Sequence, residues 1–206
     1  TRARDLAAFV SNADGDIKFD TDTLFIDSSA NKVGIGTDSP NRALSLEDGD
    51  IQIHDTGTSG DPLINFSVGN TQASPTQSWS MRVDNSDGDK FQLLDVTDGR
   101  TVLTADGDGN FLIGTDSART VQGFTSRQQI EGTSATTSSL SLVRNSNSVD
   151  PPYLNFGKSR STSVGGSAIV QADDVLGRLD FAGANGSNIN DLAARIDVRV
   201  DGTPGS

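Results

Sequence analysis

The chain has 206 residues, a net charge of −12 at pH 7 and no cysteine, and 33% of its residues are hydrophobic. This low apolar content predicts thin cores, and because no disulfide can form, partner chains are the expected source of added stability. The 16 basic residues are scattered, whereas phosphate binding needs clustered Lys and Arg, so nucleic acid and anionic membrane surfaces are excluded as partners. No apolar run predicts a membrane span or an export signal, so synthesis in a reducing cytoplasm is expected.

Residues 1–19 are expected to form an attachment segment that contains one short helix. Its apolar residues recur at the spacing of one helical face: Ala3, Leu6, Ala7 and Val10. A helix of about ten residues does not persist alone in water, so this stripe is expected to dock on another protein or on symmetry mates. Arg2 and Arg4 are either solvated charges or contacts at the rim of the docking site.

After residue 19 the apolar residues alternate with polar ones, which is typical of strands with one buried face. The alternating residues are Leu44 and Leu46, Ile51 and Ile53, Ile64, Phe66 and Val68, Trp79, Met81 and Val83, Phe91 and Leu93, Leu140 and Leu142, Leu154 and Phe156, Leu179 and Phe181, and Ile196, Val198 and Val200. Asp-Gly pairs such as 87–88 and 98–99 separate the runs and supply the positive φ angles of tight hairpin turns. The pattern predicts an all-β fold of antiparallel hairpins.

Two sequence strings occur twice and indicate an internal duplication. Ile-Gly-Thr-Asp-Ser stands at residues 35–39 and again at 113–117, and Asp-Pro-Leu-Ile-Asn-Phe at 61–66 returns as Pro-Pro-Tyr-Leu-Asn-Phe at 151–156. The order is kept while the spacing grows, as expected when a loop is inserted into one copy of a duplicated unit. We expect two tandem antiparallel β-rich modules, at residues 20–98 and 99–206.

The element Val33-Gly34-Ile35-Gly36 places two glycines on one face of a predicted strand. Glycine weakens a strand and marks a bulge or a close backbone approach. Two interpretations stay open. In one, the glycines form a β-bulge before the Ser39-Pro40 turn. In the other, the bare face lets Val33, Gly34, Ile35 and Gly36 meet neighbouring chains at a three-fold axis.

Three segments resemble phage tail-fibre proteins, particularly those of marine and cyanobacterial short-tailed phages, which often end in an endosialidase-type intramolecular chaperone. Residues 31–40 resemble a Val-Gly-Ile-Gly-Thr-x-Ser-Pro element that recurs in such fibres, residues 1–7 resemble the attachment segment, and residues 195–206 resemble shaft sequence. In the second copy Leu112 replaces Gly34 and Ala118 replaces Pro40, so an axial contact is expected in the first module only.

The resemblance implies a structural virion protein that is made in the host cytoplasm and forms an elongated homotrimeric fibre. Its amino-terminal segment is expected to attach to tail proteins such as an adaptor or nozzle. Because no chaperone or tip follows residue 206, the chain is expected to be the tail-proximal part of a longer fibre. Host contact would then belong to a distal region that carries the receptor-binding function.

No catalytic residue, cofactor site or metal site is expected. The one histidine, His54, lies opposite Ile51 and Ile53 on a strand-like run, which indicates an exposed residue. Residues 106–110 carry oxygen ligands at positions 1, 3 and 5 of an EF-hand-like loop, but Phe111 and Ser117 occupy the positions that require Gly and Glu. A solvated hairpin turn is therefore favoured over a calcium site.

Other functions are weighed against a tail fibre. A head fibre or a tail-tip adaptor would share most of the sequence features. A bacterial Ca²⁺-dependent β-rich surface adhesin would need a short regular Gly and Asp repeat and an export signal. A glycan-depolymerase spike would need paired carboxylates and aromatic platforms, but most acidic residues lie in turns and Trp79 shares its face with Met81 and Val83, as a core residue does.

Overall fold

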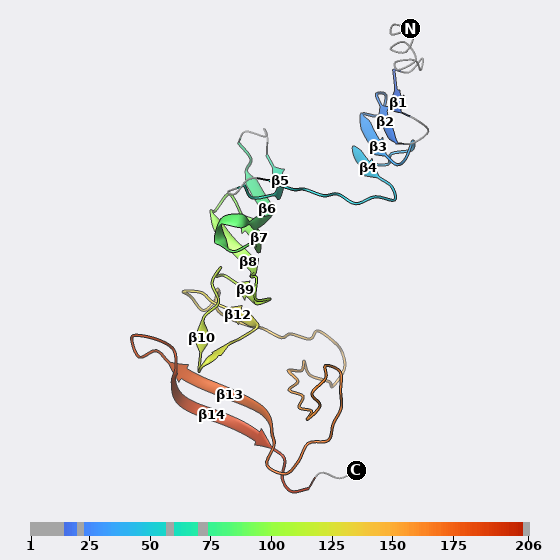
Figure 1. Ribbon diagram of the computed structural model, residues 1–206. Coiled ribbons are helices and arrows are strands. Elements are labelled where there is room, and N and C mark those ends of the chain that lie inside the picture. The colour runs from blue at the N-terminus through green and yellow to red at the C-terminus, as the bar shows by residue number, and fades with distance from the viewer. Residues whose placement is uncertain (1–14, 20–22, 57–59, 70–73, 204–206) are drawn as a thin grey trace. The chain divides into compact units, whose positions relative to one another are not determined.

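The structure is a computed structural model that describes residues 15–19, 23–56, 60–69 and 74–203 (Figure 1). The chain forms two compact units, residues 1–54 and 55–206. The described part consists of strands, turns and extended segments, and its one helical element is a 3-10 turn, η1 (Asn85–Asp87). The all-β prediction is therefore confirmed. The predicted amino-terminal helix lies outside the described residues, as do Arg2, Arg4, Leu6, Ala7 and Val10.

The first unit contains a four-stranded sheet in the order β1 (Ile17–Phe19), β2 (Leu24–Asp27), β3 (Lys32–Ile35) and β4 (Leu44–Leu46). The antiparallel β2–β3 turn is held by Asp27, which accepts hydrogen bonds from the Ala30 amide at 2.7 Å and from the Ser29 hydroxyl at 2.8 Å. After β3 the chain turns at Gly36 and returns as β4, which is parallel to β3. The crossover at residues 37–43 makes this parallel pairing possible.

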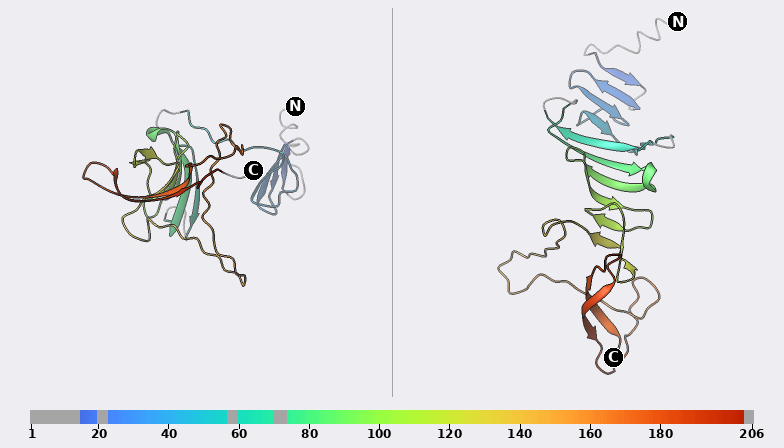
Figure 2. Two further views of the ribbon diagram at one scale, coloured as in Figure 1. Left: turned by 90° about the horizontal axis from the view of Figure 1, so that it is seen from below. Right: turned by 90° about the vertical axis from the view of Figure 1, so that its left-hand side faces the viewer.

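The second unit contains a six-stranded sheet in the order β12-β9-β8-β7-β6-β5, whose strands lie one beside the next in Figure 2. Its strands are β5 (Leu63–Val68), β6 (Gln77–Asp84), β7 (Lys90–Asp95), β8 (Arg100–Ala105), β9 (Phe111–Ile113) and β12 (Gln128–Ile130). Two hairpins complete the unit: β10 (Thr120–Val121) with β11 (Phe124–Thr125), and β13 (Val175–Gly183) with β14 (Asp191–Arg199).

The turns of the large sheet agree with the predicted Asp-Gly signals. Gly88 ends η1 between β6 and β7 with a φ of 71°, and Gly99 has a φ of 63° between β7 and β8. Asp84 caps η1 by accepting a hydrogen bond from the Ser86 amide. The predicted module boundary at 98/99 lies in the β7–β8 turn, inside this one sheet. The two compact units of the structure divide after residue 54, where no boundary was predicted.

The repeated Ile-Gly-Thr-Asp-Ser string adopts the same pairing in both places. In each copy an antiparallel hairpin, β2–β3 or β8–β9, is followed by a crossover and a parallel strand, β4 or β12. The Ile35 carbonyl accepts the Glu47 amide at 2.9 Å, and the Ile113 carbonyl accepts the Glu131 amide at 3.0 Å. The β10–β11 hairpin is inserted in the second crossover, which is six residues longer than the first and so accounts for half of the twelve-residue growth in spacing.

Some predicted features are absent from the described structure. No strand forms at Ile51 and Ile53, at Leu140 and Leu142, or at Leu154 and Phe156. The β3–β4 and β9–β12 pairs are parallel, so the expectation of antiparallel pairing throughout was wrong for them. A crossover, rather than a two-residue turn, connects the strands of each of these pairs, and the alternation pattern does not distinguish the two connections.

Gly36 and Gly114 occupy equivalent turns that require glycine for two reasons. Both have a φ of 76°, a conformation that side chains rarely adopt. A Cβ atom at Gly36 would also collide with the Glu47 carbonyl, and one at Gly114 with the Glu131 carbonyl. The close approach of each glycine to this carbonyl lets the parallel strand after the crossover lie beside the hairpin.

We expect Gly114→Ala to destabilise the protein more than Gly123→Ala does. Gly123 has nearly the same φ, 79°, but nothing lies within 4 Å of an added Cβ atom. The control should therefore show only the backbone strain, about 1–2 kcal/mol, whereas Gly114→Ala adds an overpacking cost of about 1–3 kcal/mol. Urea titration measures both free energies of unfolding. Equal losses would show that the Glu131 carbonyl does not require glycine at position 114.

Candidate assembly surface

The sheet of the first unit has one face made entirely of apolar side chains. The strand register places eight of them there: Ile17, Phe19, Leu24, Ile26, Val33, Ile35, Leu44 and Leu46. None of the eight is buried, and Leu44 is 55% exposed. We call this set the first apolar face. Within the described residues of the unit, no second layer buries it.

The opposite face of this sheet is the covered one. Phe25 is buried there, and it pairs across the strands with Gly34. Thr37 and Pro40, from the crossover, are also buried. Thr37 lies so close to Gly34 that a Cβ atom at Gly34 would collide with the Thr37 carbonyl. The crossover therefore supplies the small core of the unit from the side opposite the first apolar face.

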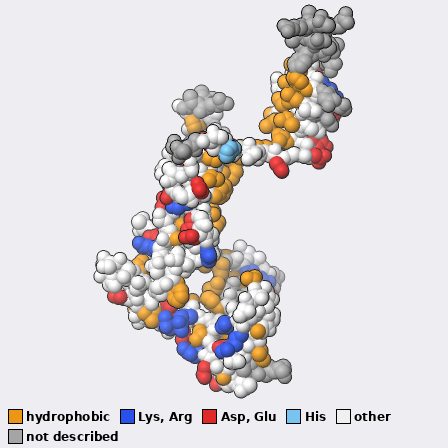
Figure 3. Space-filling model, viewed as in Figure 1, with side chains coloured by type: hydrophobic (Ala, Val, Ile, Leu, Met, Phe, Trp, Pro, Cys, Tyr) orange, Lys and Arg blue, Asp and Glu red, His pale blue; other side chains and the backbone are white. Residues whose placement is uncertain are grey.

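The six-stranded sheet repeats this arrangement on a larger scale. Its register aligns one apolar residue from each strand in a row: Ile64, Met81, Leu93, Leu103, Ile113 and Ile130. Phe66, Trp79, Val83, Phe91 and Phe111 lie on the same side. We call these residues the second apolar face. Phe66 is 55% exposed, and Figure 3 shows apolar side chains at the surface of both units.

The opposite side of the large sheet buries polar groups. Ser80, Gln92 and Thr104 lie on this side and are each no more than 3% exposed. Arg82 donates from Nη1 to Asp61 at 2.9 Å and from Nη2 to Asp84 at 2.6 Å, and from Nε to the Gln92 amide oxygen at 3.0 Å. Globular domains bury apolar side chains and expose polar ones. In this sheet of the single chain, the side with polar side chains is buried and the side with apolar side chains is exposed.

The β13–β14 ribbon has a third apolar face, formed by Leu179, Phe181, Ile196 and Val198. On its other face, Arg178 pairs with Asp197 at 2.7 Å and Arg195 pairs with Asp180 at 2.6 Å. Phe156 lies against Gly177, at the edge of a groove that also involves Leu154. A two-stranded ribbon alone is marginally stable in water, so this face needs a cover.

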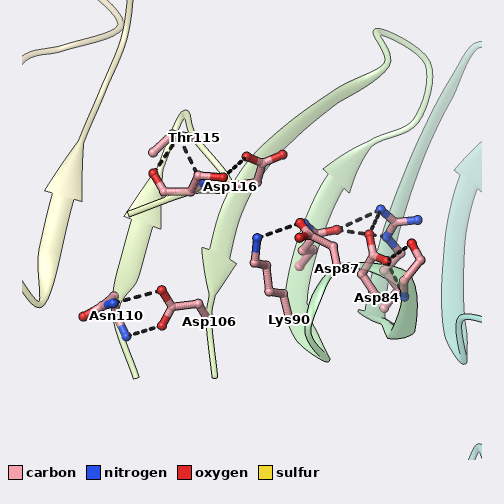
Figure 4. A network of polar contacts seen from close by, with 11 residues as sticks. Asp84, Asp87, Lys90, Asp106, Asn110, Thr115 and Asp116 are labelled. Atoms are coloured by element: carbon pink, nitrogen blue, oxygen red, sulfur yellow. Dashed lines mark hydrogen bonds and ion pairs between the residues drawn. The ribbon is translucent and has the colours of Figure 1, made fainter. Parts of the chain in front are cut away.

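The aspartate-rich loop at residues 106–110 closes on itself (Figure 4). Asp106 accepts hydrogen bonds from the Asp108 amide at 3.1 Å and from the Asn110 amide and side chain at 2.8 and 2.9 Å. These bonds, those from Asn110 above all, hold the pKa of Asp106 below its ordinary value. Among the residues that the structure describes, no three His, Cys, Asp or Glu side chains gather as metal ligands do.

The sequence-predicted site residues have different outcomes. Val33 and Ile35 lie on the first apolar face, where a neighbouring chain can reach them. Gly34 does not offer the open bare face that an axial contact needs, because Thr37 of the same chain fills that space. Gly36 is explained by its own turn. The three-fold axis itself stays a prediction. His54 is exposed and lies outside any strand.

Acid should weaken the ribbon through its aspartates. The hydrogen bond from Arg178, followed by that from Arg199, lowers the pKa of Asp197 to about 2. A carboxylate with a lowered pKa stabilises the folded state above its unfolded pKa of about 4, and this contribution disappears as the pH falls towards 2. We expect the thermal midpoint to fall over this range, and to fall less in Asp197→Asn than in the control Asp201→Asn. Identical pH profiles for the two variants would contradict this assignment.

Comparison with known proteins gives no family assignment. The chain matches no protein-family model and no curated protein sequence. None of the helical structure in the described residues has the length and apolar character of a membrane-crossing helix. The three apolar faces and the sequence resemblance are therefore the features of this chain that bear on its function.

Proposed function

We propose that this chain is a structural protein of a phage virion, a tail-fibre segment that assembles as a homotrimer. The observation that carries the proposal is the exposure of one apolar face on each of the two main sheets. Such faces lower the free energy of a protein only when another surface removes them from water. A second and a third copy of the chain offer matching faces, and three of them can meet around one axis.

The exposure of apolar side chains supports an obligate assembly. In the described chain, the only large apolar side chains that are buried are Phe25 and Leu112. By contrast, Leu44 and Phe66 are each 55% exposed. Permanent protein interfaces are more hydrophobic than transient ones and resemble a domain core cut in half, which fits apolar faces of this kind.

The fibre role is supported by the resemblance of residues 31–40 and by the recurrence of their structural unit at residues 100–131. In a fibre, repeated sheet units have a mechanical role: they bear load and set the distance between the two ends of the fibre. The amino-terminal segment would attach the trimer to a tail protein, and a distal region would contact the host. The chain itself would act as a spacer that holds that region away from the tail.

We expect Phe66→Asp to abolish trimer formation while Ser67→Asp preserves it. Both residues lie on β5 and are exposed in the single chain, but only Phe66 belongs to the second apolar face. Three carboxylates would enter an apolar interface in the first variant, and unpaired buried charges are strongly unfavourable. Sedimentation velocity should give three times 21.5 kDa for the wild type and for Ser67→Asp. A monomeric wild type, or a stable trimer of Phe66→Asp, would contradict the proposal.

Attachment to the tail is expected to depend on the apolar stripe of residues 3–10. Leu6→Asp should remove the fibre from virions and leave the β-structure trimeric, because helix-in-groove docking depends on apolar anchors. Arg2→Ala should reduce fibre content only modestly, since exposed ion pairs contribute about 0–1 kcal/mol. Quantitative blots of purified particles measure fibre content. Normal occupancy with Leu6→Asp would exclude the stripe as the anchor.

A further inference from the structure

We propose that residues 153–156 add a strand to the outer edge of β13 in a neighbouring copy of this chain. The ribbon β13–β14 would thereby become a three-stranded sheet built from two chains. The choice of a second copy as the partner rests on the proposed homotrimer. The existence of an unpaired strand and a vacant sheet edge rests on the described structure alone.

The first copy of the repeat shows how this sequence behaves when it is paired. Residues 63–66, Leu-Ile-Asn-Phe, lie within β5 and pair antiparallel with β6, with Ile64 opposite Met81 and Phe66 opposite Trp79. β6 then continues into the β6–β7 hairpin. In the second copy, residues 153–156, Tyr-Leu-Asn-Phe, precede the β13–β14 hairpin in the same order. Within the described chain, the edge of β13 that corresponds to the place of β5 carries no strand.

In the second copy, the backbone N–H and C=O groups around residues 153–156 are unpaired, as they are in a strand that has no neighbour. From residue 151 to residue 158, the structure shows no backbone hydrogen bond to any described residue. The side chains in this segment are equally uncovered: Tyr153 is 62%, Leu154 61% and Phe156 54% exposed. Unpaired N–H and C=O groups beside exposed apolar side chains form a template for another chain.

The connection to the hairpin is long enough for residues 153–156 to reach a neighbouring copy. Ten residues, 67–76, separate Phe66 from β6, whereas eighteen, 157–174, separate the equivalent Phe156 from β13. Eighteen extended residues span up to about 60 Å. In the single chain, Phe156 lies on the face of the ribbon at Gly177 and leaves the edge of β13 vacant. A connection of this length permits the exchange of a strand between identical subunits as well as pairing within the chain, and cross-linking distinguishes the two.

Engineered cysteines test the exchange directly because the chain contains none of its own. Asn155 lies between Leu154 and Phe156, so it is expected on the side of the new sheet that carries Arg178 and Asp180 on β13. Asn155→Cys is combined with Arg178→Cys in one variant and with Asp180→Cys in a second. The two pairs test two registers of the added strand against β13. Asn155→Cys with Asp201→Cys, beyond β14, is the matched control. Each purified trimer is oxidised and run on a denaturing gel without reductant.

We expect covalent dimers and trimers from at least one of the two test pairs, and at least tenfold less of them from the control. Disulfides confined to single chains would overturn the exchange, because residues 153–156 would then pair with their own β13. An intact trimer without disulfides in either test pair would also overturn it and would leave the homotrimer standing. A wild-type protein that is monomeric would instead refute the proposed function on which the choice of partner rests.

Discussion

One apolar face on each main sheet is left uncovered by the described part of the chain, and the rest of the proposed account depends on these faces. In each sheet the opposite face is the covered one, as Thr37 over Gly34 and the buried Phe25 show in the first sheet and as the buried Gln92 and Thr104 show in the larger one. The apolar side is left to water. Because apolar burial is the dominant favourable contribution to folding, the proposed assembly would add to the stability of a chain arranged in this way.

The repeated hairpin–crossover–strand unit accounts for this orientation. A parallel strand must be reached by a connection that passes over one face of the sheet. In both copies the crossover begins at a glycine with a φ of 76° and is followed by a Thr whose hydroxyl accepts the amide of the residue two positions later. The covered face is therefore decided by the turn at Gly36 or Gly114, and the alternating apolar residues occupy the other side.

Much of the local structure follows from the sequence. Alternation predicted the strands that carry Phe66, Met81 and Leu93, and the Asp-Gly pairs predicted the turns at Gly88 and Gly99. The parallel pairs were missed because alternation is the same in either direction of pairing. The side that is buried was missed for a related reason: Leu93 and Gln92 alternate in the same way whichever face is covered. Leu154 and Phe156 have a strand pattern, but within the described chain no strand pairs with them.

The second apolar face is exposed in the single chain, and the proposed trimer would bury it. Hydroxyl-radical footprinting, read by mass spectrometry, measures this at Phe66, Phe91 and Phe111, which are 55%, 45% and 41% exposed in the single chain. The account predicts that all three are protected in the native assembly and become reactive when it is dissociated. Equal reactivity of these phenylalanines in the native and dissociated protein would contradict it.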